Sequence, residues 1–295
     1  MGKSLSRMAL VLAVLLLLGG LAAGCGGGGD KPQDANQGQT STELSETLQV
    51  NGSTTVAPIA QAWAEAFHEK NPKVEVVVSG TGSGDGIAAL INGTTDIAMA
   101  SREMKDKEKE QIKNGTPVEY IVGYDALAVI VHPGNPVQSL SMEQVKDIFT
   151  GRIKNWKEVG GPDKAIIIYT RDTSSGTYEF FKEHVLNKEE FADNAKKVAS
   201  TAAMTKSVAQ DETSIGYVGL AFVDSTVKAL AVSNEGGNPV APSVETAKSK
   251  EYPIVRGLNM YTINEAQGLA KAFLDFGLSA EGQAMVQEVG YIPVK

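Results

Sequence analysis

The sequence has little cysteine, little histidine and no excess of positive charge, and each shortage excludes a class of protein. Cys25 is the only cysteine among 295 residues, so no disulfide can form within the chain. The three histidines are His68, His132 and His184, and no two of them have the spacing of a metal-binding motif, so we expect no metal site. A formal net charge of −8 argues against nucleic acid and anionic lipid as partners.

The apolar residues near the N-terminus are also too few for a membrane-spanning helix. Lys3 and Arg7 form a basic start, and the apolar run 8–18 is shorter than the ~20 residues that a span needs. This layout is typical of a secretory signal peptide. The stretch 21–25, Leu-Ala-Ala-Gly-Cys, resembles a bacterial lipobox, in which the signal is cut before a cysteine that then carries lipid. We expect residues 1–24 to be a lipoprotein signal peptide and Cys25 to be the lipidated (palmitate-bearing) residue, although a plain secretory peptide is the alternative.

A polar segment follows the predicted signal peptide. Residues 26–29 are all glycine, and Gln, Asn, Ser and Thr dominate up to about residue 46, so residues 25–47 are predicted to be a flexible tether. The protein would then be anchored to the cell membrane on its extracytoplasmic side.

From residue 48 onward, β-branched runs alternate with amphipathic helical patterns. We expect strands at 74–78, 96–100, 121–131, 165–169 and 214–220. Helical patterns lie at 56–67, 141–149 and 266–276. This alternation predicts an α/β fold with mixed, mainly parallel sheets flanked by helices. We expect two lobes, with residues 48–124 and 233–295 in lobe I and residues 125–232 in lobe II.

Three loops share one design, in which a strand leads through Gly, Ser and Thr into a helix. They are Gly52-Ser53-Thr54-Thr55-Val56, the segment 79–86 (Ser-Gly-Thr-Gly-Ser-Gly-Asp-Gly) and the segment 171–177 (Arg-Asp-Thr-Ser-Ser-Gly-Thr). The N-terminus of a helix has unpaired N–H groups and a partial positive charge, and glycine lets the backbone approach a ligand closely. Such loops predict an oxyanion site, with Arg171 adding a full charge at the mouth of a cleft. Each loop alone is equally compatible with ordinary helix capping.

These motifs resemble the phosphate-binding proteins of phosphate ABC importers. The resemblance covers nearly all of the mature chain that would follow the signal peptide. It includes the three loops, the segment 95–103 (Thr-Asp-Ile-Ala-Met-Ala-Ser-Arg-Glu), the segment 149–156 (Phe-Thr-Gly-Arg-Ile-Lys-Asn-Trp), the segment 214–218 (Ser-Ile-Gly-Tyr-Val) and the segment 290–294 (Gly-Tyr-Ile-Pro-Val). It implies a type II periplasmic-binding-protein fold whose cleft encloses inorganic phosphate. It further implies delivery of phosphate to the permease subunits of an ABC importer, without enzymatic activity or cofactor; we expect a monomer.

The resemblance also implies which residues bind the anion. They are Thr54, Thr55, Ser83, Ser101, Arg171, Ser175, Gly176 and Thr177. Ser101 departs from the family pattern, because the best-known members have an aspartate there that accepts the proton of bound phosphate. Asp85 or Asp172 could supply a carboxylate instead, and Arg102 could contact the ligand or form an ion pair at the surface.

Three other functions are compatible with parts of the sequence. A binding protein for sulfate or molybdate would have the same fold and the same lipobox. An adhesin or sensor with this fold is a second possibility. A serine hydrolase is a remote third, because Ser175 is not within a Gly-x-Ser-x-Gly motif and no histidine is marked as its base. The glycine-rich segment 79–86 has neither the Gly-Lys-Ser/Thr of a P-loop nor the spacing of a dinucleotide-binding loop.

Overall fold

The computed structural model describes residues 46–234 and 236–294. The strands are β1 (Thr47–Gly52), β2 (Glu75–Gly80), β3 (Ile97–Ala100), β4 (Pro117–Val131), β5 (Ser139–Ser141), β6 (Ile167–Arg171), β7 (Lys196–Val198), β8 (Ser214–Gly219), β9 (Lys228–Ala229), β10 (Ala231–Ser233) and β11 (Val255–Ile263). The helices are α1 (Ala57–Lys70), α2 (Ser83–Ile91), α3 (Asp106–Lys109), α4 (Met142–Phe149), α5 (Gly176–His184), α6 (Thr201–Ala209), α7 (Val244–Lys248), α8 (Gly268–Gly277) and α9 (Ala280–Glu288), with 3-10 turns η1 (Trp156–Val159) and η2 (Leu220–Phe222).

The predicted signal peptide, Cys25 and almost all of the predicted tether lie outside the described residues. Among the described helices, none combines the length and the apolar character that crossing a bilayer requires.

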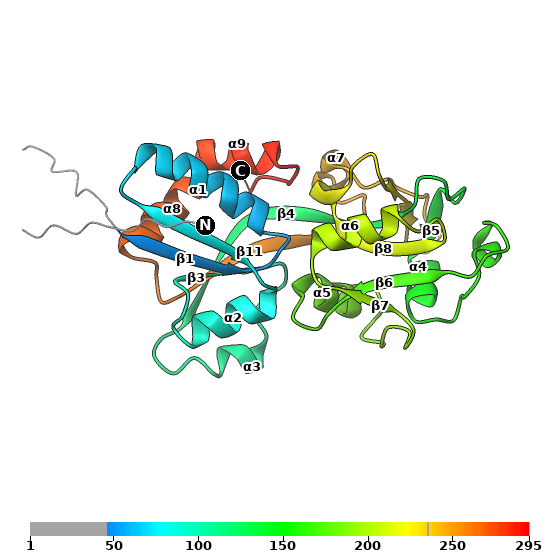
Figure 1. The fold of residues 1–295 in the computed structure, drawn as a ribbon, viewed down its shortest axis with the longest axis horizontal. Coiled ribbons are helices and arrows are strands. Elements are labelled where there is room, and N and C mark those ends of the chain that lie inside the picture. The colour runs from blue at the N-terminus through cyan, green and yellow to red at the C-terminus, as the bar shows by residue number, and fades with distance from the viewer. Residues whose placement is uncertain (1–45, 235, 295) are drawn as a thin grey trace, which may run out of the picture. The chain divides into compact units, whose positions relative to one another are not determined.

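Most strands join one mixed sheet in the order β2-β1-β3-β11-β4-β8-β6-β7, with β9 also paired to β4 (Figure 1). The pairs β1–β2, β1–β3, β6–β8 and β6–β7 are parallel. In contrast, β11 is antiparallel to β3 and β4, and β4 is antiparallel to β8. Strands β1, β2 and β6, which lead into the three loops, belong to these parallel pairs, so the loops leave the sheet in the manner of α/β proteins.

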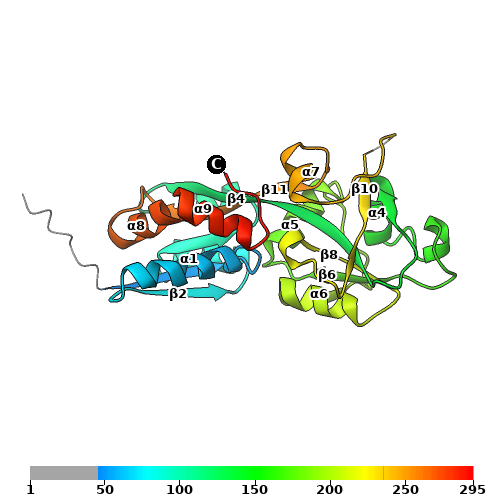
Figure 2. The same cartoon turned by 90° about the horizontal axis from the view of Figure 1, so that it is seen from above.

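The described residues form two main hydrophobic cores. One includes Trp63 and Phe273, where α1 packs against α8 and α9 (Figure 2). The other includes Phe149, Phe181 and Tyr217, with the rings of Phe181 and Tyr217 stacked at a centroid distance of 4.1 Å. Truncating a buried aromatic residue such as Trp63 to Ala costs about 3–5 kcal/mol of folding free energy, so each core is a major stabilising element.

Strand β4 belongs to both cores. Its residue Val122 lies in the first core, whereas Ala126, Leu127 and Val129 lie in the second. The N-terminal half of β4 pairs with β11 and its C-terminal half pairs with β8. The chain therefore passes from one core to the other within a single strand.

The predicted elements agree with the structure in type, and most of their ends shift by one to four residues. The capping box predicted by residues 141–144 is confirmed, because Ser141 Oγ accepts from the Gln144 N–H at 3.1 Å and Gln144 Oε1 accepts from the Ser141 N–H at 2.9 Å. The sequence patterns did not predict β11, which adds the antiparallel pairs at the centre of the sheet.

Candidate functional site

Each of the three predicted loops joins a strand to a helix, as the sequence indicated. The first joins β1 to α1, the second joins β2 to α2, and the third joins β6 to α5. Backbone hydrogen bonds connect them, because the N–H of Gly82 donates to the Gly52 carbonyl and the N–H of Gly84 donates to the Ser174 carbonyl, both at 2.8 Å. The loops therefore form one continuous backbone surface at the ends of their strands.

Hydroxyl groups from these loops meet others that follow β3 and β7 in a group that we call the hydroxyl cluster, consisting of Thr54, Thr55, Ser83, Ser101, Thr177 and Thr201. All of them except the half-buried Thr54 are buried. Within it, Ser83 Oγ lies 3.4 Å from Ser101 Oγ, which lies 3.4 Å from Thr177 Oγ1. Thr177 Oγ1 lies 3.1 Å from Thr55 Oγ1. Loops that are distant in the sequence thus place small donors within one anion's reach of each other.

Thr201 was not predicted to belong to the site, yet it is central to the cluster. Its Oγ1 lies 2.9 Å from Thr54 Oγ1 and 3.2 Å from Thr55 Oγ1, and its side chain is buried. Ser200 and Thr201 follow β7 and begin α6, with Ser200 Oγ accepting from the Ala203 N–H. This is a fourth strand–hydroxyl–helix loop, and that local pattern was the available signal, although the loop has no glycine.

Arg171 supplies a guanidinium group to the cluster. Its Nη1 donates to Thr201 Oγ1 at 3.3 Å, while Nε and Nη2 donate to the carbonyls of Val198 and Ala199. The prediction that Arg171 lies at a cleft mouth is wrong, because the residue is only 2% exposed. Burial lowers the pKa of Arg171, although the nearby Asp172 carboxylate acts in the opposite direction.

Gly176 begins α5 where no larger residue fits. A Cβ at this position would lie 2.2 Å from Ser83 Oγ and 2.8 Å from Ser101 Oγ. The absence of a side chain therefore allows the first turn of α5 to approach both hydroxyls.

Ser175 is buried at the N-cap of α5, where its Oγ accepts from the Tyr178 N–H at 3.2 Å. His184 is the last residue of α5, so a helix of nine residues separates the two side chains. At about 1.5 Å per residue, that separation is roughly 13 Å, which is too far for His184 to act as a base for Ser175.

Four helices begin at the hydroxyl cluster. Thr55 lies just before α1, Ser83 and Thr201 are the first residues of α2 and α6, and Thr177 lies in the first turn of α5. Each helix N-terminus carries roughly half a positive charge. Together, the four helix N-termini and the Arg171 guanidinium make this site positive. Most of its donors are nevertheless neutral groups, and the whole chain has a formal net charge of −8.

The charged residues whose roles the sequence left open lie in other environments. Asp85 is exposed on α2, and Asp172 Oδ1 accepts from the N–H and the hydroxyl of Ser174. Arg102 is buried and forms a bidentate ion pair with Glu108, at 2.7 and 2.8 Å. The contacts found among residues 46–234 and 236–294 therefore connect none of these three side chains to the hydroxyl cluster.

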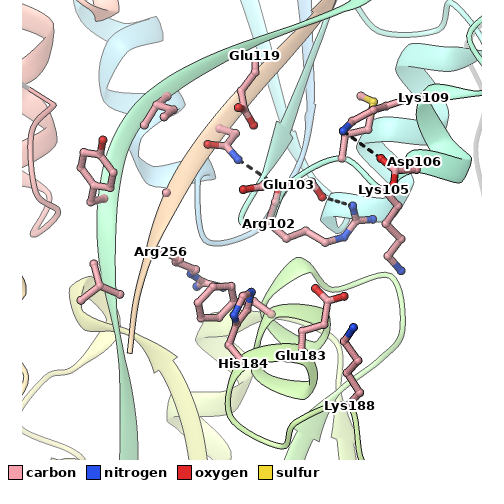
Figure 3. Close-up of a pocket in the computed structure, with 17 residues that line it drawn as sticks. Arg102, Glu103, Lys105, Asp106, Lys109, Glu119, Glu183, His184, Lys188 and Arg256 are labelled. Carbon is pink, nitrogen blue, oxygen red and sulfur yellow. Dashed lines mark hydrogen bonds and ion pairs between the residues drawn. The ribbon is translucent and has the colours of Figure 1, made fainter. Parts of the chain in front are cut away.

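A separate pocket of about 860 Å³ is lined by residues of both charges (Figure 3). Arg102, Glu119, His184 and Arg256 are among its lining residues, and no member of the hydroxyl cluster is. Within the described part of the chain, no group of three or more His, Cys, Asp or Glu side chains is arranged to hold a metal ion.

Comparisons with known proteins relate the chain to binding proteins. A model of the PBP superfamily domain matches residues 37–281. A protein named phosphate-binding protein PstS from Bacillus subtilis is 34% identical over 296 aligned residues, covering 100% of this chain and 95% of the relative.

Two solved structures are similar in both sequence and fold. One, from Clostridium perfringens, is described as a phosphate ABC transporter substrate-binding protein with bound phosphate; it is 35% identical, has a TM-score of 0.77, and covers 84% of this chain and 100% of its own. The other, described as an ABC-type phosphate transport receptor from Vibrio cholerae, is 32% identical, has a TM-score of 0.67, and covers 83% of this chain and 99% of its own.

Proposed function

This chain belongs to the PBP superfamily and, within it, to the family of the phosphate-binding proteins, and from that premise we propose that it captures inorganic phosphate outside the cytoplasmic membrane and delivers it to an ABC-type importer. It acts as a binding protein and performs no catalytic step. The permease subunits of the importer are its protein partners, and it works as a monomer.

One observation carries the proposal: the hydroxyl cluster and the Arg171 guanidinium meet at the N-termini of four helices. A dianion such as hydrogen phosphate offers several acceptor oxygens in a tetrahedral arrangement. Such a ligand suits a site in which many small donor groups point inward from several directions. The residues that would bind it are Thr54, Thr55, Ser83, Ser101, Arg171, Ser175, Gly176 and Thr177, to which we add Thr201. Gly176 would contribute its backbone N–H, and Ser175 orients the first turn of α5 by capping it.

Calorimetric titration of the chain without residues 1–25 tests this proposal. Phosphate, sulfate and molybdate are each added to the same preparation. We expect phosphate to bind most tightly. Tighter binding of sulfate or molybdate would replace the ligand assignment, and no binding of any of the three would reject the oxyanion site.

Discrimination between phosphate and sulfate would rest on hydroxyl groups. Ser101 stands where the resemblance to the family implies a carboxylate, and the side chain of Asp85, on the same helix as Ser83, is exposed. A hydroxyl can rotate to donate to sulfate, whereas a carboxylate cannot. The ratio of phosphate to sulfate affinity should therefore stay the same in Asp85→Asn, and a changed ratio would assign Asp85 a role in selectivity.

We also propose that the two cores are two lobes that close over the ligand. The hydroxyl cluster supports this proposal, because Thr55 and Ser83 follow strands that pack in the first core, while Thr177 lies on α5, whose Phe181 packs in the second. We place the return to lobe I within β11 rather than near residue 233, since Ala247, Tyr252 and Ile254 pack in the second core. Small-angle scattering with and without saturating phosphate should show a smaller radius of gyration in its presence, and identical profiles would contradict closure.

The membrane anchor is the remaining part of the proposal. Lipidation of Cys25, the only thiol, would hold the protein at the extracytoplasmic face of the membrane through the polar segment after it. The variant Cys25→Ala should appear in the soluble fraction and take up no radiolabelled palmitate. Retention of the label by this variant would place the lipid elsewhere.

A further inference from the structure

A buried ion pair is hydrogen-bonded to Ser101 of the hydroxyl cluster. Arg256 on β11 and Asp125 on β4 are cross-strand neighbours, and Nη2 and Nε of Arg256 donate to Asp125 Oδ2 at 2.8 and 3.2 Å. Their side chains are 1% and 0% exposed. Asp125 Oδ1 also accepts from the Leu220 N–H at 3.1 Å, just after β8.

The third donor group of Arg256 reaches the predicted anion site. Its Nη1 donates to the Ser101 carbonyl at 3.1 Å, which holds that carbonyl on the side of β11. On the other side of the same residue, the Ser101 N–H donates to Ser83 Oγ at 3.1 Å, and Ser101 Oγ lies 3.4 Å from Thr177 Oγ1. Arg256 thereby fixes the orientation of Ser101 without belonging to the cluster.

Arg256 also touches the helix on the opposite side of the cluster. Its Cζ lies 5.6 Å from the centre of the Phe180 ring, on α5, in a cation–π contact. Phe180 is three residues after Thr177 and four after Gly176, so the three residues share one face of α5. One guanidinium group therefore contacts both the Ser101 loop and the helix that carries Thr177.

The two contacts of Arg256 matter because the Ser101 loop and the first turn of α5 approach each other closely. A Cβ on Gly176 would lie only 2.8 Å from Ser101 Oγ, so a small shift of either side changes the spacing of the donors. Because Asp125 neutralises Arg256, the pair adds little net charge toward an anion, and its effect is on position.

We propose that Arg256, held by Asp125, is a positioning residue that sets the Ser101 loop against the first turn of α5. This inference rests on the proposed anion site. It assigns a function to residues on the two strands that connect the cores, outside the ligand-binding set.

Three variants of the mature chain separate positioning from stability. Arg256→Met leaves the buried Asp125 without its charged partner, and it should lower both the melting temperature and phosphate affinity. In Asp125→Asn/Arg256→Met no buried charge remains, and the introduced amide keeps an oxygen for the Leu220 N–H. The double variant should regain most of the melting temperature while binding phosphate about tenfold more weakly than the wild type, since the Ser101 carbonyl still lacks its donor. Wild-type affinity in the double variant would overturn the proposal.

The matched control is Tyr252→Phe, which removes a buried hydrogen bond from the Tyr252 hydroxyl to the Leu127 carbonyl on β4, at 2.9 Å. This control should lose stability without losing affinity. If its affinity falls as much as that of the double variant, the effect is a general loss of stability and the inference is wrong.

Hydrogen exchange in the absence of anion tests the positioning independently of any ligand. The Ser101 amide should exchange faster in the double variant than in the wild type, and in Tyr252→Phe it should not. Unchanged exchange at Ser101 would overturn the inference. In contrast, a wild-type protein that binds no oxyanion would reject the proposed function and leave this exchange result as the measure of positioning.

Discussion

Replacing Arg171 by Met removes the full positive charge of the predicted site while keeping an apolar stem of similar length. Three donor directions of Arg171 are used within the protein, toward Val198, Ala199 and Thr201, and a guanidinium group has five N–H donors. At least one further charge-assisted hydrogen bond is therefore available to a bound anion. Such a bond contributes about 1.5–3 kcal/mol, so phosphate affinity should fall about ten- to a hundredfold.

The same substitution should also destabilise the protein, because it leaves the buried carbonyls of Val198 and Ala199 without their donor. Leaving such groups unpaired costs about 1–3 kcal/mol. Calorimetry measures the affinity and thermal unfolding measures the stability, both at a temperature where the variant is folded. The two losses should appear together in this one variant.

The control for charge is Arg152→Met. It removes the same charge from a side chain that is 50% exposed and paired with Asp147 and Glu189. Phosphate affinity should not change in this control. An unchanged affinity in Arg171→Met would remove Arg171 from the site, and an equal loss in both variants would show that long-range charge, rather than contact, produces the effect.

Three further outcomes follow from the contacts. Thr201→Val keeps the shape but removes the hydroxyl, so calorimetry should show up to about tenfold weaker phosphate binding, and wild-type affinity would exclude Thr201 from the site. Gly176→Ala places a methyl group against Ser83 Oγ, so affinity should fall at least about tenfold although Ala favours the helix, and unchanged affinity would contradict the close approach. Burial raises the pKa of Glu108, but hydrogen bonds from Arg102 and from a backbone N–H outweigh it and lower that pKa below 4.5. The ion pair therefore contributes its full stability well above pH 4.5 and loses it as the pH falls below that value, so the difference in melting temperature between wild type and Glu108→Gln should be largest at neutral pH and shrink on acidification; a difference that does not change with pH would refute the assignment.

The sequence patterns predicted those parts of the candidate site that are formed by residues close together in the sequence. A cluster of Gly, Ser and Thr between a strand and a helix is visible in a few residues, and all three such loops lie where they were expected. Thr201 was missed because its loop has hydroxyls but no glycine, and only the tertiary structure brings it to Thr54, 147 residues away.

Buried polar residues account for most of what the patterns missed. Strand β11 carries Arg256 and Asn259, which interrupt the apolar run that usually marks a buried strand, yet both are almost fully buried because they have partners. Arg256 pairs with Asp125 across 131 residues of sequence, and no local pattern predicts such a pairing. The same reason explains Arg171, whose burial depends on the carbonyls of another loop.

The chain passes from the first core to the second and back, and this path determines the order in which the two cores can fold. The residues of the second core come from one stretch of the sequence, except for Ile292, so they can assemble while the chain is still being made. The first core cannot, because Trp63 donates to the carbonyl of Gly282, 219 residues downstream. The Tyr291 hydroxyl donates to the Thr55 carbonyl at 2.5 Å, so the first loop of the candidate site is held by a residue 236 positions downstream. A chain that stops before residue 291 therefore lacks the contact that holds the Thr55 carbonyl, and the first loop of the candidate site gains it only after the first core has formed.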